Sequence, residues 1–257
     1  MRRVVEQWGT IISIEVCDRI DERAIDACVA WFARVDDLFS TWRTDTEIMR
    51  IASGALAVDD ADADVRSVLE RCEQMRLESG GAFDISFGAR AGLAPRPGLA
   101  ALDPSGLVKG WAVARAGDLL HDAGASNFFI NAGGDVLTRG HAEGGGGWRL
   151  GIRHPWEHDR VAAVLVVSDA GVATSGRYER GDHVVDPRTG APALGLASVT
   201  VVGPDLAVAD AYATAAIALG PADGMRWLAT RAGYEGMGIT DDRAVVLTPG
   251  FGRYRVS

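Results

Sequence analysis

The sequence predicts one α+β domain built on a mixed, mostly antiparallel sheet with flanking helices. Three observations predict it. The 257 residues, 47% hydrophobic and 24% charged, suffice for a large buried core and have the composition of a globular protein. Short alternating apolar runs are interspersed with longer runs of helical periodicity. No repeat of fixed period and no low-complexity linker divides the chain, so we expect a single domain over residues 1–257.

The individual elements follow from these two periodicities. Helices are predicted from apolar residues at helical spacing, with Asp21, Gly80 and Gly124 as boundary signals. Strands are predicted from alternating or continuously apolar runs. Helices are predicted over 21–42, 63–81, 107–124, 208–220 and 224–236. Strands are predicted over 10–16, 148–152, within 162–176 and 198–203, with hairpins over 126–140 and 236–248. The Gly- and Pro-rich stretch 82–106 is predicted to be a loop with at most one short strand.

Charge and cysteine content exclude several classes of function. The formal charge of −9, without a run of Lys or Arg, argues against broad nucleic-acid or anionic-membrane binding. No apolar run of a signal peptide follows the first residues, and no window is apolar over the roughly 18 residues of a membrane span. Cys17, Cys28 and Cys72 form no C-x-x-C pair. We therefore expect a cytoplasmic protein with reduced thiols, no membrane anchor and no nucleic-acid partner.

Four polar clusters interrupt the apolar framework, and each admits a structural reading. They are GGAFDIS (80–86), LDPSGLVKG (102–110), NAGGDV (131–136) and ATSGRYERGDHVVDPRTG (173–190). The second is not a phosphate-binding G-x-x-x-x-G-K-[ST] loop, and Ser175 lies in no G-x-S-x-G elbow, which argues against a serine hydrolase. His183 is a candidate general base, although a lone histidine also serves structural roles.

The Ala-rich run VADAYATAAIALG (208–220) carries two oxygen-bearing side chains one helical turn apart. Residues at i and i+4 share a face, so Asp210 and Thr214 can direct a carboxylate and a hydroxyl at the same point. Such ligands suit Mg²⁺, which takes one or two protein carboxylates and completes its octahedron with other oxygens. The alternative is that Asp210 caps the helix while Thr214 packs in the core. The run itself does not decide between them.

The joint order of these clusters resembles the ApbE family of FAD:protein FMN transferases. The motifs that carry the resemblance run from Trp8 to Gly220: WGTIISIEV, FSTWRTDTEI, GGAFDIS, LDPSGLVKGWAV, NAGGDVLTRG, WRLGIRHP, VATSGRYERGDHVVDPRTGAP and SVTVVGPDLAVADAYATAAIALG. The resemblance implies one ApbE-like, T-fold-related domain, either as one body or as two intertwined subdomains around a central FAD and Mg²⁺ site. It also implies Mg²⁺-dependent transfer of FMN from FAD to a threonine or serine hydroxyl of an acceptor protein, with release of AMP.

Carried over position by position, the resemblance implies the residues of that site. The metal ligands would be Asp210, Thr214 and main-chain oxygen from the Gly106 and Ala213 regions. FAD would lie against Trp8, Trp42, Ala82, Phe83, Asp84, Asp103 and Lys109, with Thr174, Ser175 and His183 from the later cluster. His183, Lys109 and Asp210 would be the catalytic residues.

The chemistry of these residue types agrees with that implication. Attack on a diphosphate needs charge neutralisation at phosphorus and a deprotonated nucleophile. Mg²⁺ and Lys109 would supply the first, and a neutral His183 imidazole would take the hydroxyl proton. Two alternatives remain. Residues 84–103 form a shorter segment than in typical members, and a site opened to water would hydrolyse FAD to FMN and AMP. A flavin-binding module without catalysis is the other alternative.

Overall fold

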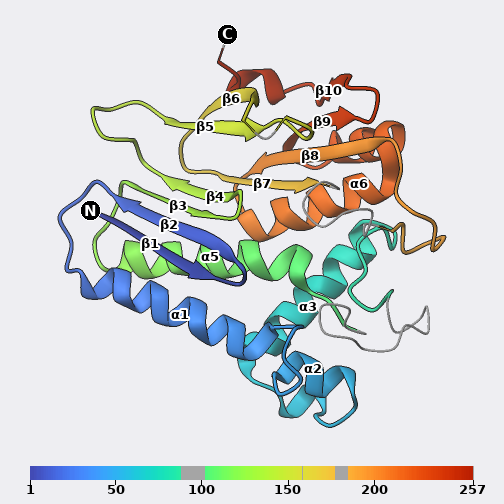
Figure 1. The fold of residues 1–257 in the computed structure, drawn as a ribbon, viewed down its shortest axis with the longest axis horizontal. Coiled ribbons are helices and arrows are strands. Elements are labelled where there is room, and N and C mark those ends of the chain that lie inside the picture. Colours follow the sequence, from blue (N-terminus) through green and yellow to red (C-terminus); the bar gives the residue numbers. More distant parts are fainter. Residues whose placement is uncertain (88–101, 158, 177–184, 257) are drawn as a thin grey trace.

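The computed structural model describes residues 1–87, 102–157, 159–176 and 185–256 and has the predicted α+β architecture (Figure 1). Within these ranges, eight strands form one sheet in the order β1-β2-β3-β4-β7-β8-β9-β10, and all neighbours pair antiparallel. The strands are β1 (Arg2–Gln7), β2 (Thr10–Val16), β3 (Phe128–Ala132), β4 (Asp135–Arg139), β7 (Gly171–Gly176), β8 (Leu196–Gly203), β9 (Glu235–Thr240) and β10 (Val245–Leu247). The predicted mostly antiparallel sheet is confirmed.

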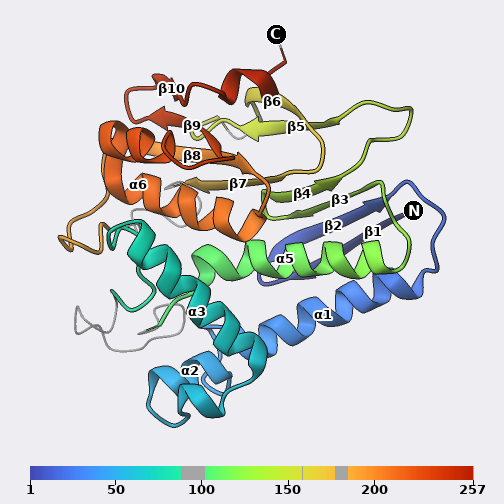
Figure 2. The ribbon, with the colours of Figure 1, turned by 180° about the vertical axis from the view of Figure 1, so that it is seen from behind.

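Helices cover one face of this sheet, and a separate hairpin of β5 (Trp148–Arg153) and β6 (Val161–Val167) covers part of the other. The helices are α1 (Arg23–Phe39), α2 (Glu47–Ala52), α3 (Ala63–Glu78), α5 (Ser105–Asp122) and α6 (Leu206–Leu228), with short 3₁₀ turns η1 (Val58–Asp60) and η2 (Phe251–Tyr254). Figures 1 and 2 show α1 and α5 beneath β1–β4, α6 alongside β7 and β8, and the β5–β6 hairpin above β4 and β7. None of the described helices is both long and apolar enough to cross a membrane.

Alternation along the strands creates two hydrophobic cores, one on each face of the sheet. On β8, Val199 and Val201 belong to the helix-side core, whereas Val202 belongs to the core beneath the hairpin. The same alternation acts on β7, where Val172 packs on the hairpin side and Ala173 on the helix side. Neighbouring polar residues of β7 are therefore sent to opposite faces, which decides which of them can reach the helices.

The structure departs from the sequence prediction in three elements. Strand β1 and the short helix α2 were not expected from their patterns. The helices predicted over 208–220 and 224–236 lie on the two sides of a kink in α6, where Gly220 has φ 82° and Pro221 follows. This element ends at Leu228, and the chain from Glu235 onward is strand β9. A Pro cannot donate to the preceding turn, which accounts for the kink, whereas the end of the second helix at Leu228 rather than at Gly236 was not expected.

Candidate functional site

The site lies where α5 crosses α6, and two glycines of α5 make that crossing close. A Cβ atom on Gly110 would stand 2.6 Å from the Leu206 carbonyl oxygen, so only hydrogen fits against the α6 backbone there. A Cβ on Gly106, one turn earlier, would stand 3.1 Å from Thr214 Oγ1 and 3.2 Å from the Phe83 ring. The predicted metal residues Gly106 and Thr214 are thus in contact, together with Phe83.

Asp205, rather than Asp210, caps helix α6. The Asp205 carboxylate accepts hydrogen bonds from the backbone N–H groups of Ala207 (2.8 Å) and Val208 (3.2 Å) and pairs with Arg71 of α3 at 2.7 Å. Asp210 lies more than a full turn inside the helix and is 3% exposed. The capping alternative for Asp210 is therefore wrong, and a buried carboxylate inside a helix needs another explanation.

Asp210 and Thr214 line one side of the crossing. Asp210 Oδ2 accepts a long hydrogen bond (3.4 Å) from the Gly110 N–H, and Thr214 Oγ1 lies 3.1 Å from Ser175 Oγ on β7. Burial, followed by the neighbouring Asp135 carboxylate, raises the pKa of Asp210 well above its usual value, and the Lys109 ammonium only partly opposes this. Ala213, between them, is fully buried.

Asp135 completes this group of charges and was not singled out from the sequence. It opens β4 after the Gly133–Gly134 turn, is 0% exposed, and its Oδ2 lies 3.0 Å from Lys109 Nζ. Its Oδ1 accepts a hydrogen bond from the Thr174 N–H at 3.3 Å. The sequence predicts the NAGGDV motif only as part of the hairpin over 126–140. An acid immediately after that turn, at the start of an apolar strand, was the available signal.

Thr174 and Ser175 diverge as strand alternation requires. The Ser175 hydroxyl meets Thr214 on the helix side, whereas the Thr174 hydroxyl lies 2.9 Å from Thr200 Oγ1. Thr174 reaches the charged group only through its main-chain N–H. Of the two predicted neighbours, only Ser175 places its side chain beside α6.

The predicted flavin-contacting loop meets the start of α5. Ala82 and Phe83 are buried after α3, and the Phe83 N–H donates to Ser79 Oγ at 2.9 Å. Asp84 Oδ1 accepts from both the N–H and the hydroxyl of Ser86, at 2.9 and 2.8 Å. Asp103 Oδ1 accepts from Ser105 N–H at 3.0 Å and so opens α5. Both aspartates therefore shape the backbone around Phe83 and Gly106.

The two predicted ring-stacking tryptophans occupy different settings. Trp8 lies in the β1–β2 turn at φ 56°, an uncommon value for a bulky residue, and its indole N–H donates to the Phe32 carbonyl at 3.1 Å. Trp42 is 69% exposed in the turn between α1 and α2, beside Arg43, which pairs with Asp45 at 2.9 Å. Trp42 thus offers an open indole face, whereas the Trp8 indole is anchored to α1.

His183 lies outside the described residues, but the chain that follows it can be placed. Arg188 makes a two-pronged contact with Asp186 (2.9 and 2.8 Å), which lowers the pKa of Asp186. A Cβ on Gly81 would lie 3.7 Å from Arg188, and one on Gly190 would lie 3.9 Å from the ring of Phe87. The 185–190 segment therefore borders the loop that carries Phe83. Arg188 is a second residue that sequence reasoning passed over.

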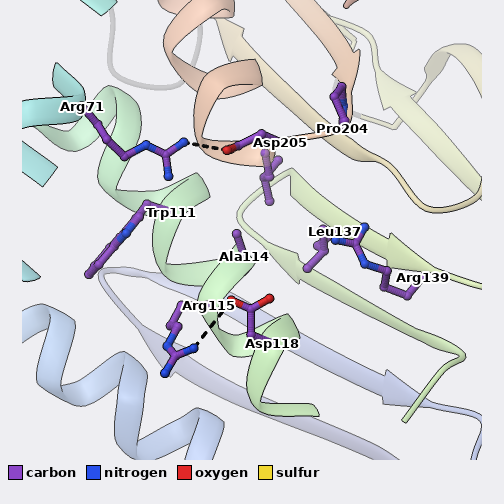
Figure 3. A pocket seen from close by; sticks show the side chains of 10 residues that line it. Arg71, Trp111, Ala114, Arg115, Asp118, Leu137, Arg139, Pro204 and Asp205 are labelled. Atoms are coloured by element: carbon purple, nitrogen blue, oxygen red, sulfur yellow. Dashed lines mark hydrogen bonds and ion pairs between the residues drawn. The ribbon is translucent and has the colours of Figure 1, made fainter. Parts of the chain in front are cut away.

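A cavity of about 270 Å³ lies apart from this group, on another face of α5 (Figure 3). Its lining residues on α5 are Trp111, Ala114, Arg115 and Asp118. By helical periodicity they lie on a different face of α5 from Gly106, Lys109 and Gly110. Its other lining residues are Arg71, Leu137, Arg139, Pro204, Asp205 and Leu206. The Arg71–Asp205 pair (2.7 Å) and the Arg115–Asp118 pair (3.7 Å) offset much of its charge. The predicted site is therefore not this cavity.

The buried charges at the α5–α6 crossing fit a divalent cation. Two buried carboxylates, Asp135 and Asp210, face one partly exposed ammonium, Lys109, so the ionised group would carry a net negative charge. The additional hydroxyl of Thr214 is a hard oxygen donor. No cluster of three or more His, Cys, Asp or Glu side chains with metal-binding geometry occurs in the part of the chain that the structure describes. A low-carboxylate site of this kind suits Mg²⁺ rather than Zn²⁺.

Comparison with known proteins shows which sequences this chain resembles. FAD:protein FMN transferases from Rhodobacter capsulatus and Escherichia coli K12 are 36% and 35% identical, over 58% and 47% of this chain. One from Klebsiella pneumoniae is 27% identical over 82% of the chain. These matches span 30%, 37% and 75% of the three relatives' lengths, respectively.

Solved structures match over nearly the whole chain. The flavin transferase ApbE from Vibrio cholerae has a TM-score of 0.85 at 22% identity, covering 99% of both chains. The ApbE protein from Thermotoga maritima has a TM-score of 0.87 at 22% identity, covering 100% of this chain and 99% of the other. These likenesses show the fold. Because the ApbE family model also matches residues 8–96 and 90–237, the chain belongs to the ApbE family.

Proposed function

We propose that this protein transfers FMN from FAD to a threonine or serine hydroxyl of an acceptor protein, with Mg²⁺ as its metal and AMP as the second product. The observation that carries the proposal is the group formed by Asp210, Thr214 and Lys109 at the α5–α6 crossing. It supplies oxygen ligands for a cation and an ammonium for an anion side by side. The relatives are FAD:protein FMN transferases, which supports the same reaction.

Asp210 and Thr214 would hold Mg²⁺, with main-chain oxygen from the Gly106 and Ala213 regions. When bound, Mg²⁺ neutralises charge on the diphosphate during phosphoryl transfer. Lys109 would bind a diphosphate oxygen through its ammonium. A hydrogen bond between the Ser175 and Thr214 hydroxyls would orient the Thr214 hydroxyl. Whichever of the two donates, the Thr214 oxygen keeps a lone pair for the metal.

The flavin and adenosine ends of FAD would extend from this point along the surfaces that the loop residues form. Phe83 lies against Gly106, and Asp84 and Asp103 hold the backbone on either side of it. Trp42 offers an exposed ring for stacking a planar group. Binding energy from these remote contacts would position the diphosphate for attack.

The proposed step makes one bond and breaks one bond at the phosphorus of the FMN half. The acceptor hydroxyl oxygen attacks that phosphorus, and the bond from this phosphorus to the bridging oxygen breaks. FMN is left esterified to the acceptor, and AMP departs with the bridging oxygen and its electron pair. We propose His183 as the base that takes the hydroxyl proton. The Lys109 ammonium would stabilise the charge that develops on the departing phosphate.

Incubation with FAD, Mg²⁺ and a protein that another ApbE-family transferase modifies tests the proposal. We expect covalent flavin on the acceptor, seen by in-gel fluorescence and by a mass increase of one FMN, with an equal amount of AMP. AMP release at the same rate without acceptor would instead select hydrolysis of FAD. Stoichiometric FAD binding with no AMP under any divalent cation would select a binding module and refute the proposal.

Mg²⁺ affinity is expected to rise with pH. The pKa of Asp210 is raised in the metal-free fold, so the cation must displace a proton from this carboxyl where it is protonated. Above the unfolded-state value of 3.8, the metal-free fold binds more protons than the unfolded chain, and its stability falls as pH rises toward the raised pKa. Mg²⁺ therefore offsets more of that loss at higher pH.

Thermal unfolding with and without Mg²⁺ at a series of pH values above 3.8 measures this effect, because the raised pKa of Asp210 acts over that range. We expect the Mg²⁺-induced rise in melting temperature to grow with pH in the wild type and to be absent in Asp210→Asn. A Mg²⁺ effect that is equal across the range, or that survives in Asp210→Asn, would show that the cation binds elsewhere.

A further inference from the structure

Lys109 is the only lysine in the chain. Of the 26 Lys and Arg residues, the other 25 are arginine. The general preference of this sequence for arginine over lysine therefore has one exception, at position 109. The two cations differ physically, because an ammonium is a compact point charge whereas a guanidinium is a planar fork that binds carboxylates in pairs of hydrogen bonds. Position 109 thus points to a need for the ammonium.

The carboxylate facing this lysine is held rigidly. The turn before Asp135 has Gly133 at φ 59° and Gly134 at φ 102°, and Asn131 Oδ1 accepts the Gly134 N–H at 2.9 Å. A Cβ on Gly133 would lie 2.7 Å from Thr10 Oγ1, so this turn is pressed against the start of β2. The Asp135 carboxylate, fully buried, is fixed from β7 by the Thr174 N–H.

A rigid carboxylate is the partner that a flexible lysine needs in order to act at one point. The Lys109 side chain has a flexible four-carbon stem and is 27% exposed. Without the Asp135 contact, substrate binding would have to order this side chain at a cost in rotamer entropy. Asp135 Oδ2 receives the ammonium at 3.0 Å, beside the face of α5 that meets Asp210. Because an ammonium has three donors, one can bind a carboxylate while another binds a phosphate oxygen.

We infer that Asp135 is a positioning residue, which holds the sole lysine of the chain so that its ammonium meets the diphosphate of FAD. The inference rests on the proposed function for its substrate. It also explains why arginine is absent here. A guanidinium at position 109 would pair with Asp135 through both nitrogens and stay on the carboxylate instead of reaching the substrate.

Amine labelling tests the contact without requiring any turnover. Lys109 Nζ and the terminal amine of Met1 are the only primary amines in the chain, so mass spectrometry after limited acetylation reports on each separately. We expect Asp135→Asn to acetylate several-fold faster at Lys109, with the Met1 amine as internal reference. Asp62→Asn, which removes the carboxylate that pairs with Arg34 at 2.7 Å, should leave Lys109 labelling unchanged. Unchanged labelling in a folded Asp135→Asn protein would overturn the inference.

AMP release then separates positioning from a purely structural role. We expect Asp135→Asn and Lys109→Gln each to lower kcat/KM for FAD about 10- to 100-fold, the range for a lost hydrogen bond to a charged group. The double variant should lose no more than Lys109→Gln alone, and Lys109→Arg should not restore the rate. If the two fold-losses in kcat/KM multiplied in the double variant, the inference would be overturned. Loss of Mg²⁺-induced stabilisation in Asp135→Asn would also overturn it, because Asp135 would then be a metal ligand. A wild type without AMP release would refute the proposed function, and the labelling result would still decide the role of Asp135.

Discussion

Asp210→Asn is expected to abolish Mg²⁺-dependent AMP release while leaving the fold intact. Asparagine has the same shape and keeps one oxygen, so it opens no cavity among the buried neighbours of position 210. It removes the charge that the cation requires. Loss of metal stabilisation worth several kcal/mol corresponds to a fall in kcat of at least about 10²–10³-fold. Turnover and thermal unfolding, each measured with and without Mg²⁺, provide the readouts.

Asp205→Ala is the matched control on the same helix. It removes the cap of α6 and the ion pair with Arg71, and loss of a cap typically costs about 0.5–2 kcal/mol of stability. We expect this variant to melt at a lower temperature and to retain Mg²⁺-dependent turnover. If Asp210→Asn instead melted early and kept its response to Mg²⁺, Asp210 would be a structural residue.

Gly110→Ala is expected to separate α5 from α6 and to destroy the site. The added Cβ would lie 2.6 Å from the Leu206 carbonyl oxygen and 2.9 Å from the Ala207 Cα, both backbone atoms that cannot rotate away. Alanine gains roughly 1 kcal/mol over glycine in helix propensity, but overpacking typically costs about 1–3 kcal/mol, and here it acts on two backbones. The variant should melt at a lower temperature and lose both Mg²⁺ binding and turnover.

Gly106→Ala is the comparison variant, because its added Cβ would meet side chains of the site instead of the α6 backbone. Its Cβ would meet Thr214 Oγ1 at 3.1 Å and the Phe83 ring at 3.2 Å, which are side-chain atoms able to shift by a few tenths of an ångström. We expect near-normal melting with weakened Mg²⁺ binding, because the Thr214 hydroxyl would be displaced. Equal stability losses in the two glycine variants would contradict the close helix crossing as the basis of the site.

Local sequence patterns were sufficient to predict most elements of this fold. Strand β2 and helices α1, α3 and α5 lie where alternation or helical spacing placed them, to within a few residues. Strand β1 was missed because its pattern is half-buried with two arginines at its start, and a sheet edge needs no clear apolar face. The end of α6 was misjudged, because the helix predicted over 224–236 stops at Leu228 and the chain from Glu235 pairs into the sheet as strand β9.

The site was predictable where chemistry lies within one element and not where the fold assembles it. Asp210 and Thr214 share one helix, so their spacing alone indicated a common face. The identity of the helix cap could not be decided from that spacing, because Asp205 and Asp210 both lie near the start of the segment. Asp135 was missed because its meaning depends on Lys109, which is brought to it from α5 only by the sheet and helix packing.

The central claim is that the α5–α6 crossing holds the metal and the diphosphate of FAD together. A crystal structure with FAD and Mg²⁺ bound tests it most directly. We predict the cation on Asp210 and Thr214, with the diphosphate between it and Lys109. A diphosphate in the arginine-lined cavity of Figure 3, or a cation that leaves Asp210 without a contact, would contradict the claim.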